Sequence, residues 1–316
     1  MIDPVVTEQR QRLVEEAQRT IAAGSKSFRF ASQIFGLATR ERSWLLYSWC
    51  RACDDITDGQ TLGHDAVPVD DPATRIAFLR AQTDAALAGQ PTGLAPFDAL
   101  AVVAAETHIP ADLPHDHLAG FARDAAGWTP TSQDDLLSYC YQVAGAVGVM
   151  MAHVMGVDPA APNARDTLDR AADLGIAFQL ANIARDIVDD ARVGRSYIPT
   201  DWDRPEQESL DPLDPAQRDR LVAIAQRLAD LAHRYRASSK VGAARLPFRS
   251  RWAVLSAAAI YGEVATRAVE LGPRAWDKRI SIYRAEKFML VAGAGIEALL
   301  PPRKFSREGL WTRPAR

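Results

Sequence analysis

Apolar residues recur along most of this chain at intervals of three and four positions, the spacing that places them on one face of an α-helix. In the segment that follows Pro215, for example, Leu221, Leu228 and Tyr235 lie on one apolar stripe, and charged residues occupy the opposite face. An aspartate followed by proline is a typical helix start. The pattern therefore predicts a helix that begins near Asp214 and Pro215.

Nine further stretches have the same periodicity, and the segments between them are short and polar or rich in Pro and Gly. The predicted helices cover about 5–23, 39–57, 73–88, 94–107, 115–126, 131–155, 163–192, 246–271 and 284–299. Thr131 and Asp134 resemble a capping box at the start of one of them. Convincing alternating strands are absent. The sequence therefore predicts an all-α protein, with residues 1–316 in one domain.

Composition narrows the functional class. The 316 residues are 47% hydrophobic and 24% charged, with a net charge of -3, so no basic excess favours nucleic-acid binding. The N-terminus is charged and lacks the apolar core of a secretory signal, and no apolar run is long enough to span a bilayer. Three cysteines are typical of a reducing compartment, and Cys50 and Cys53, inside an apolar run, favour packing over metal binding. We expect a cytoplasmic protein.

Two acidic clusters stand out. The first contains Arg51, Asp54, Asp55 and Asp58. Asp54 and Asp58 lie four positions apart, so both carboxylates point to the same side of a helix, and Arg51 joins that face. Asp55 lies off this stripe and is expected to face solvent or to support a ligand.

The second cluster is a longer polar stripe. Asn182, Asp186 and Asp190 follow one another at intervals of four, and Gly175 and Gln179 extend the stripe backwards. The rest of this helix is rich in Leu, Ile, Phe and Ala. A polar stripe on so apolar a helix favours a shared polar cavity over bulk water.

One such acidic string is more often a solvated helix face than a functional site, but two together favour function. Carboxylates four positions apart repel each other, and a divalent cation removes that repulsion. Mg²⁺ prefers oxygen ligands and keeps several waters, so it can bridge carboxylates and phosphates. The clusters therefore predict a site for Mg²⁺, with Mn²⁺ as an alternative, that stabilises a departing diphosphate.

Both clusters resemble signature motifs of the squalene/phytoene synthase family, the first over Tyr47 to Asp58 and the second over Leu174 to Pro199. Three other segments resemble further motifs of that family: Gly24 to Phe28, Tyr139 to Gly148, and Ala275 to Arg279 followed by Glu286-Lys287. The motifs cover nearly the whole chain in order. The last one is most similar to proteobacterial members that make phytoene.

The resemblance implies a helical isoprenoid synthase bundle with a central cavity and a role for each matching residue. The implied metal ligands are Asp54, Asp58, Asn182, Asp186 and Asp190. The implied catalytic residues are Asp54, Asp58, Asp186, Asp190, Tyr47, Tyr139 and Tyr197. The implied substrate-binding residues are Ser25, Lys26, Ser27, Phe28, Arg51, Val143, Gly145, Gly148, Gln179, Asn182, Arg185 and Arg195.

Alternatives stay open for some of these residues. Gly145 and Gly148 lie three apart on one helix, where a missing side chain either leaves room for a prenyl chain or allows close helix packing. Phe28, Phe178 and Met150 invite a role in stabilising a cation, but ordinary core packing is the simpler interpretation.

The implied reaction is the Mg²⁺-dependent head-to-head condensation of two geranylgeranyl diphosphates to phytoene through a cyclopropyl intermediate, without NADPH. One alternative within the family is a squalene or dehydrosqualene synthase that uses farnesyl diphosphate. An alternative of another class is a non-catalytic assembly factor of the same fold, against which the intact aspartates argue. A head-to-tail elongase or a terpene cyclase would not share the second motif.

A hydrocarbon product is insoluble in water, so peripheral contact with the inner face of the cytoplasmic membrane is an expectation. The basic C-terminal tail, with Arg303, Lys304, Arg307, Arg313, Arg316 and Trp311, is one candidate for docking on anionic lipid. The alternative is a frayed, solvated tail.

Overall fold

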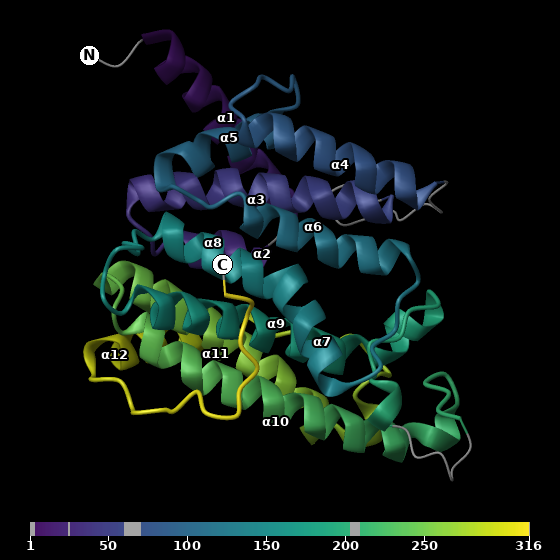
Figure 1. The fold of residues 1–316 in the computed structure, drawn as a ribbon. Helices are drawn as coiled ribbons and strands as arrows, with labels where there is room; N and C mark the ends of the chain where they lie inside the picture. The colour runs from purple at the N-terminus through teal and green to yellow at the C-terminus, as the bar shows by residue number, and fades with distance from the viewer. Residues whose placement is uncertain (1–3, 25, 60–70, 203–208, 316) are drawn as a thin grey trace. The chain divides into compact units, whose positions relative to one another are not determined.

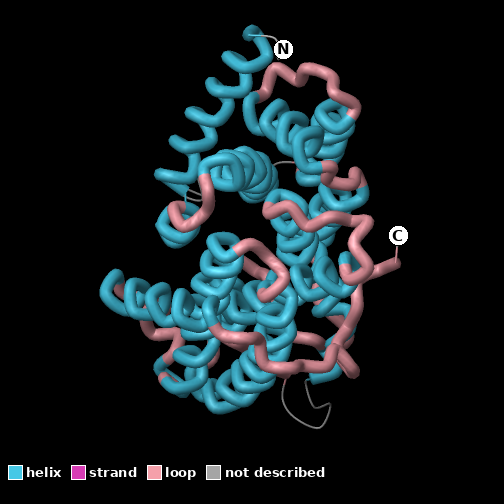
Figure 2. Tube along the Cα trace, turned by 90° about the vertical axis from the view of Figure 1, so that its left-hand side faces the viewer, coloured by secondary structure: helices cyan, strands magenta, loops and turns pink. Residues whose placement is uncertain are grey.

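The computed structural model describes residues 4–24, 26–59, 71–202 and 209–315, and every regular element in these ranges is a helix (Figure 2). This confirms the all-α class. Helix bounds follow the predicted ranges closely, because three- and four-residue spacing of apolar residues is a strong signal over long segments. A short helix, α2 (Lys26–Ser32), has no counterpart in the prediction.

The chain divides into two compact units, one made of Met1–Ala126 with Met150–Asp158 and the other of Gly127–Val149 with Pro159–Arg316. The single domain expected from the sequence stays a prediction.

The first unit is built around α3, which contacts α1, α4, α5 and α6. Its helices are α1 (Pro4–Gly24), α2, α3 (Leu37–Asp58), α4 (Pro72–Leu87), α5 (Ala95–Thr107) and α6 (Asp112–Ala125) (Figure 1). The buried face of α3 contributes Leu45 and Trp49 to the core, and α5 contributes Leu100. Burial of such side chains is worth about 1.5–3 kcal/mol each, so this face fixes how α3 lies in the unit.

A polar cluster joins three helices of the first unit. Glu106 on α5 accepts hydrogen bonds from Arg10 on α1 and Arg42 on α3, the latter at 2.8 Å, and Arg10 also bonds Glu41 at 2.8 Å. Burial raises the pKa of Glu106, but the two arginines outweigh it and lower the pKa below its ordinary value. The carboxylate therefore stays charged and holds α1, α3 and α5 together at neutral pH.

The second unit is built around α9, which packs against α7, η1, α10 and α11. Its helices are α7 (Gln133–Cys140), η1 (Tyr141–Gly145), α9 (Ala164–Arg192), η2 (Thr200–Trp202), η3 (Pro215–Gln217), α10 (Arg218–Ala243), α11 (Phe248–Glu270), η4 (Gly272–Arg274) and α12 (Arg284–Leu299). The helix α8 (Ala146–Val154) is divided between the units. The predicted start near Asp214 is confirmed, because Asp214 caps η3 through the Ala216 N–H, at 2.9 Å.

The helix predicted over 131–155 differs from expectation in two details. Its cap is Ser132, whose hydroxyl accepts from the Asp135 N–H at 3.2 Å, while the Asp135 carboxylate accepts from the Thr131 N–H at 3.1 Å. The capping pair is thus one residue later than the sequence pattern indicated. The helix also changes to a π-helical turn at η1 before α8 continues.

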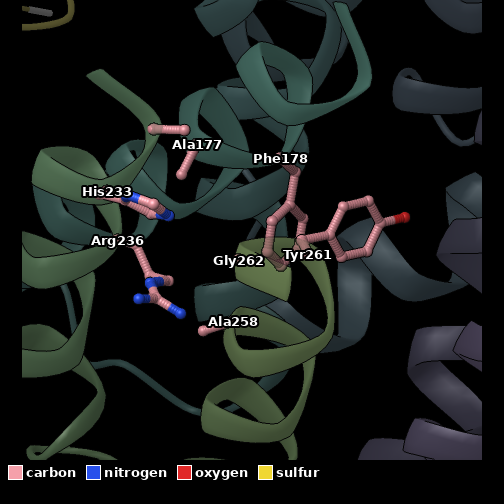
Figure 3. A pocket seen from close by; sticks show the side chains of 8 residues that line it. Ala177, Phe178, His233, Arg236, Ala258, Tyr261 and Gly262 are labelled. Atoms are coloured by element: carbon pink, nitrogen blue, oxygen red, sulfur yellow. The ribbon is translucent and has the colours of Figure 1, made fainter. Parts of the chain in front are cut away.

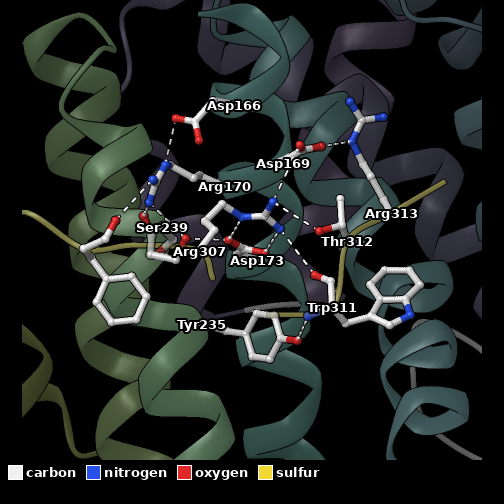
Figure 4. A network of polar contacts seen from close by, with 12 residues as sticks. Asp166, Asp169, Arg170, Asp173, Tyr235, Ser239, Arg307, Trp311, Thr312 and Arg313 are labelled. Carbon is white, nitrogen blue, oxygen red and sulfur yellow. Dashed lines mark hydrogen bonds and ion pairs between the residues drawn. The ribbon is translucent and has the colours of Figure 1, made fainter. Parts of the chain in front are cut away.

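The C-terminal segment after α12 is held against α9 and α10 by a polar network (Figure 4). Arg307 and Arg313 both reach Asp169, and Arg307 also pairs with the fully buried Asp173. The Trp311 N–H donates to the Tyr235 hydroxyl at 3.0 Å. The expectation of a frayed, solvated tail is therefore wrong for this stretch.

Candidate active site

The first acidic cluster lies at the C-terminal end of α3. Asp54, Asp55 and Asp58 are all half-buried. Arg51 donates to Asp54 and lies 3.5 Å from Asp55, so one guanidinium serves two carboxylates one turn away. Gly59, with φ of 62°, ends the helix directly after Asp58, a left-handed conformation that glycine adopts at little cost.

Tyr47 lies one turn before Arg51 on the same helix. Burial raises the pKa of Tyr47 to about 12, so its phenol stays protonated at neutral pH. A Cβ built on Gly24 of α1 would lie only 2.7 Å from this hydroxyl. The end of α1 thus approaches Tyr47 closely, and glycine at position 24 makes the approach sterically feasible.

The second acidic cluster lies in the C-terminal half of α9. Gln179, Asn182, Asp186 and Asp190 are half-buried along one stripe, as predicted. The other faces of this helix are buried in the core of the second unit by apolar residues such as Ile183. The polar stripe is therefore held in place by packing on the rest of the helix.

Arg185 pairs with its neighbour Asp186 through two hydrogen bonds, one of them 2.7 Å between Nε and Oδ1. Burial lowers the pKa of Arg185, but Asp186 outweighs that effect and the pKa is raised. Asp189, off the stripe, is exposed and pairs with Arg192 at 2.6 Å. Its solvent-facing position agrees with the interpretation from the sequence.

The segment after η4 brings a further cation to α9. The indole of Trp276 is buried and donates to the carbonyl of Ala184 at 3.2 Å. Three residues later, Arg279 lies 3.9 Å from Asp186, with a side chain that is 71% exposed. Arg279 is a candidate site residue that sequence reasoning missed, although the motif that contains it was recognised.

Two of the predicted tyrosines stack on each other in the second unit. The rings of Tyr139 and Tyr197 lie 5.1 Å apart and nearly parallel, and the ring of Trp128 lies 5.0 Å from that of Tyr139. Gly194, with φ of 75°, turns the chain after α9 so that Tyr197 returns to this stack. Trp128 was also missed, because nothing in its local sequence pairs it with residue 139.

Glycines on η1, α8 and α9 allow these helices to make close backbone contact. A Cβ at Gly148 would lie 2.4 Å from the Ala171 carbonyl oxygen, and one at Gly175 would lie 2.2 Å from that of Ala144. Gly145 is similarly crowded, by the Tyr141 ring at 2.8 Å. Close packing, one of the two interpretations of these positions, is therefore their structural role, while Val143 is half-buried on η1.

Phe178 on α9 stacks on the Tyr261 ring of α11 at 4.0 Å beside a small pocket that His233 and Arg236 of α10 also line (Figure 3). Burial raises the pKa of Tyr261, so the phenol stays neutral. The pocket has a cavity volume of about 10 Å³, about the space that one water molecule needs and far below the roughly 300 Å³ of a typical small-ligand site. It is a gap beside the polar stripe rather than a chamber for a prenyl chain, and the predicted central cavity stays a prediction.

The donor chemistry of the two clusters fits Mg²⁺. Each supplies carboxylate oxygens one helical turn apart, and α9 adds the amide of Asn182. Among the residues that the structure describes, no three acidic, histidine or cysteine side chains converge on a point. Mg²⁺ is usually held by one or two carboxylates together with waters and phosphate oxygens, so pairs of carboxylates match its needs.

The remaining predicted residues are less fully placed. Ser25 lies outside the described residues, and Lys26, Ser27 and Phe28 are described by their backbone in α2 alone. Arg195 follows the end of α9, where its N–H donates to the Asp190 carbonyl at 2.9 Å. The three cysteines are free thiols, and burial raises the pKa of Cys50 to about 12, which agrees with a packing role.

A helical protein with two paired-aspartate helices, each with an arginine beside an aspartate, has the features of an isoprenoid diphosphate enzyme. The squalene/phytoene synthase family model matches residues 21–286. The chain therefore belongs to the squalene/phytoene synthase family.

Its relatives agree with this assignment. It is 43% identical over 307 residues to a 15-cis-phytoene synthase of Paracoccus sp., covering 96% of this chain and 98% of the relative. It is also 43% identical over 313 residues to a 15-cis-phytoene synthase of Pantoea ananas, with the same two coverages. Among solved structures, a dehydrosqualene synthase in complex with a ligand matches with a TM-score of 0.76 and 25% identity, covering 91% of this chain and 96% of that one. The squalene synthase HpnC from Alicyclobacillus acidocaldarius has the same fold, with a TM-score of 0.73 at 20% identity over 85% of this chain and 97% of that one.

Proposed function

We propose that this chain condenses two geranylgeranyl diphosphates head to head into phytoene. The observation that carries the proposal is the pair of intact aspartate clusters, each half-buried and beside an arginine, in a chain 43% identical over nearly its full length to 15-cis-phytoene synthases. A non-catalytic assembly role would not require both carboxylate pairs.

We also propose that Mg²⁺ serves the reaction. Asp54 and Asp58 would hold it on α3, and Asn182, Asp186 and Asp190 would hold it on α9. When bound, Mg²⁺ neutralises charge on the diphosphate as its C–O bond breaks. The protein's own part is to present oxygen donors at fixed spacing on rigid helices, since packing of their other faces fixes both stripes.

The arginines prepare both clusters for an anionic substrate. Arg51 and Arg185 each neutralise an aspartate of their cluster. A guanidinium meets phosphate oxygens through two parallel hydrogen bonds, so these side chains can turn from carboxylate to diphosphate. Arg279, exposed and 3.9 Å from Asp186, would contact the diphosphate from the segment after η4.

The chemistry itself takes place on the substrates. Loss of diphosphate from the first substrate leaves an allylic cation, which the C2–C3 double bond of the second attacks, and loss of one proton from the resulting cation closes the ring of a cyclopropyl diphosphate. Loss of the second diphosphate, rearrangement and loss of a second proton then give phytoene. Water would quench either cation, so the apolar aromatic groups Trp128–Tyr139–Tyr197 and Phe178–Tyr261 would help by excluding it.

The main alternative within the family is condensation of two farnesyl diphosphates. The matching dehydrosqualene synthase structure supports it at 25% identity, whereas the phytoene synthases match at 43%. Sequence similarity therefore favours the longer substrate.

We further propose that the protein is cytoplasmic and contacts the membrane peripherally to release its hydrocarbon product. Within the described ranges, none of the helices combines the length and apolar character needed to cross a bilayer.

The test is turnover of purified protein with geranylgeranyl diphosphate and Mg²⁺, without NADPH. We expect a 40-carbon hydrocarbon with a conjugated triene, loss of the activity with a chelator, and its return with added Mg²⁺ or Mn²⁺. Activity that persists at full rate after chelation would contradict the metal assignment, and absence of any product would contradict the function.

A further inference from the structure

The last helix, α12, has two apolar faces. One face contains Val291, Ala294 and Ala298, which are all buried, and the two alanines pack against Leu255 and Trp252 of α11. The Trp252 indole also donates to the Val291 carbonyl at 2.8 Å. This face explains why α12 is held in the second unit, beside α11 (Figure 1).

The other face of α12 is apolar and exposed. Phe288 is 68% exposed, Met289 66%, Ile296 65% and Leu299 73%. Their spacing of one, seven and three positions places them along one side of the helix. Exposed large apolar side chains scattered singly are ordinary, but a continuous stripe of them marks an interaction surface.

The stripe continues onto the neighbouring helix. Arg251 of α11 donates to the carbonyls of Glu297 and Leu300, so the start of α11 lies beside the end of α12. Phe248 begins α11 and is 46% exposed, and Leu300 is 56% exposed. We call the set of Phe248, Phe288, Met289, Ile296, Leu299 and Leu300 the α12 surface.

The exposed charged residues at the two ends of α12 are basic, and the acids of the helix are neutralised. The helix contains two acids, and both have cationic partners: Glu286 pairs with Arg267 and Glu297 with Lys240, each at 2.7 Å. Arg284 at its start and Arg303 and Lys304 after its end are exposed. An apolar stripe with neutralised acids and basic residues at both ends is complementary to an anionic bilayer, into which amphipathic helices insert at headgroup depth.

The basic C-terminal tail, which the sequence suggested for lipid docking, is bound to α9, α10 and η1 of the protein itself. Arg307 and Arg313 are paired with Asp173 and Asp169, and the Trp311 ring packs 5.6 Å from that of Tyr141. Of the tail's basic residues within the described ranges, Arg303 and Lys304 are the ones next to α12 and exposed. The family match ends at residue 286, so nearly all of α12 lies beyond it.

We propose that the α12 surface docks this protein on an anionic lipid bilayer, with the apolar stripe in the interface and Arg284, Arg303 and Lys304 at the headgroups. The inference rests on the proposed function in one respect: a 40-carbon hydrocarbon is insoluble in water, so the enzyme must release it into a membrane. The location of the surface rests on exposure and charge alone.

The experiment is flotation of the full chain with vesicles of phosphatidylcholine, with and without phosphatidylglycerol, in the absence of substrate. We expect co-flotation with the anionic vesicles. The double variant Phe288→Ser/Ile296→Ser should lower the partition constant for anionic vesicles by about tenfold or more, because two inserted apolar side chains are lost. Arg303→Gln/Lys304→Gln should reduce binding to anionic vesicles by about tenfold and hardly change the weak binding to neutral ones.

The matched control is Leu37→Ser/Leu213→Ser, which removes two apolar side chains that are 64% and 47% exposed on other elements. It should float like the unmodified chain, and circular dichroism should show that all variants keep their helices. Equal flotation of the Phe288/Ile296 variant would overturn the proposal. A second contradicting outcome comes from light scattering. If the unmodified chain is a dimer, and the variant is a monomer that floats as well as the unmodified chain, the surface binds a second copy and not lipid. Flotation needs no turnover, so its failure is distinct from failure of the proposed function.

Discussion

Arg307 and Asp173 form a two-pronged ion pair between the C-terminal segment and α9, with Nε to Oδ2 at 2.8 Å and Nη2 to Oδ1 at 2.9 Å. Asp173 is fully buried and also accepts from the Ser238 hydroxyl of α10 at 2.5 Å. One carboxylate therefore ties together α9, α10 and a segment 134 positions further along the chain (Figure 4).

Breaking this pair should destabilise the protein strongly. Arg307→Ala leaves the buried Asp173 carboxylate without its main partner, which typically costs about 3–5 kcal/mol in the free energy of unfolding. Arg303→Ala, an exposed arginine in the same segment, should change it by less than about 0.5 kcal/mol. Urea unfolding of both variants measures the difference, and equal effects would show that the pair does not anchor the segment.

Glu106 makes stability depend on pH in the acid range. Because its pKa is lowered in the folded state, its contribution is fully present above its ordinary value of about 4.5 and is lost as the pH falls through the lower folded value. Glu106→Gln should therefore lower stability at pH 7 and flatten the acid limb below about pH 4.5. Urea unfolding between pH 3 and pH 7 tests this, with the exposed Glu270→Gln as control; an unchanged acid limb would contradict the assignment.

Substitution by alanine should destabilise the protein at Gly148, which is closely packed, and stabilise it at Gly293, which is not. Gly148→Ala would place a Cβ 2.4 Å from the Ala171 carbonyl oxygen, so α8 and α9 must move apart, at a cost of about 1–3 kcal/mol. Gly293→Ala in α12 meets nothing within 4 Å and should stabilise by up to about 1 kcal/mol, because alanine is the better helix former. Thermal unfolding measures both, and a neutral Gly148→Ala would show that the contact yields easily.

The aspartate stripe predicts a sharp contrast between neighbours on α9. Asp186→Asn removes a carboxylate that would hold Mg²⁺ against the diphosphate and should lower kcat by at least about 100-fold without loss of helical content. Asp189→Asn changes an exposed residue whose partner is Arg192 and should keep nearly normal turnover. Similar rates for the two variants would remove Asp186 from the catalytic set.

Much of the fold could be predicted from the sequence because its helices are long and amphipathic. The capping pair was placed one residue early, since Thr131 and Ser132 are both suitable cap residues and the local pattern does not decide between them. The π-helical turn at η1 has no local signal. For Gly145 on η1 and Gly148 on α8, the sequence indicated either room for a prenyl chain or close packing, and the atoms that face each glycine decide.

In the candidate site, too, features with a local sequence pattern were predicted and features that depend on three-dimensional contacts were not. The aspartate stripes were predictable because four-residue spacing on one helix fixes their common face. Arg279 was missed because it reaches α9 through a contact between segments distant in sequence, Trp276 with Ala184. Trp128 was missed because it lies in the irregular segment before α7, where helical spacing does not relate it to Tyr139. The basic tail suggested lipid docking, but two of its arginines meet buried aspartates that no local pattern connects to them.

The most direct test of the proposed function is a competition assay. The purified protein receives equal concentrations of geranylgeranyl and farnesyl diphosphate with Mg²⁺ and without NADPH, and the hydrocarbons are identified by chromatography and mass. The account predicts a 40-carbon phytoene as the main product. A 30-carbon product in excess would contradict it and assign this chain to the dehydrosqualene branch of the family.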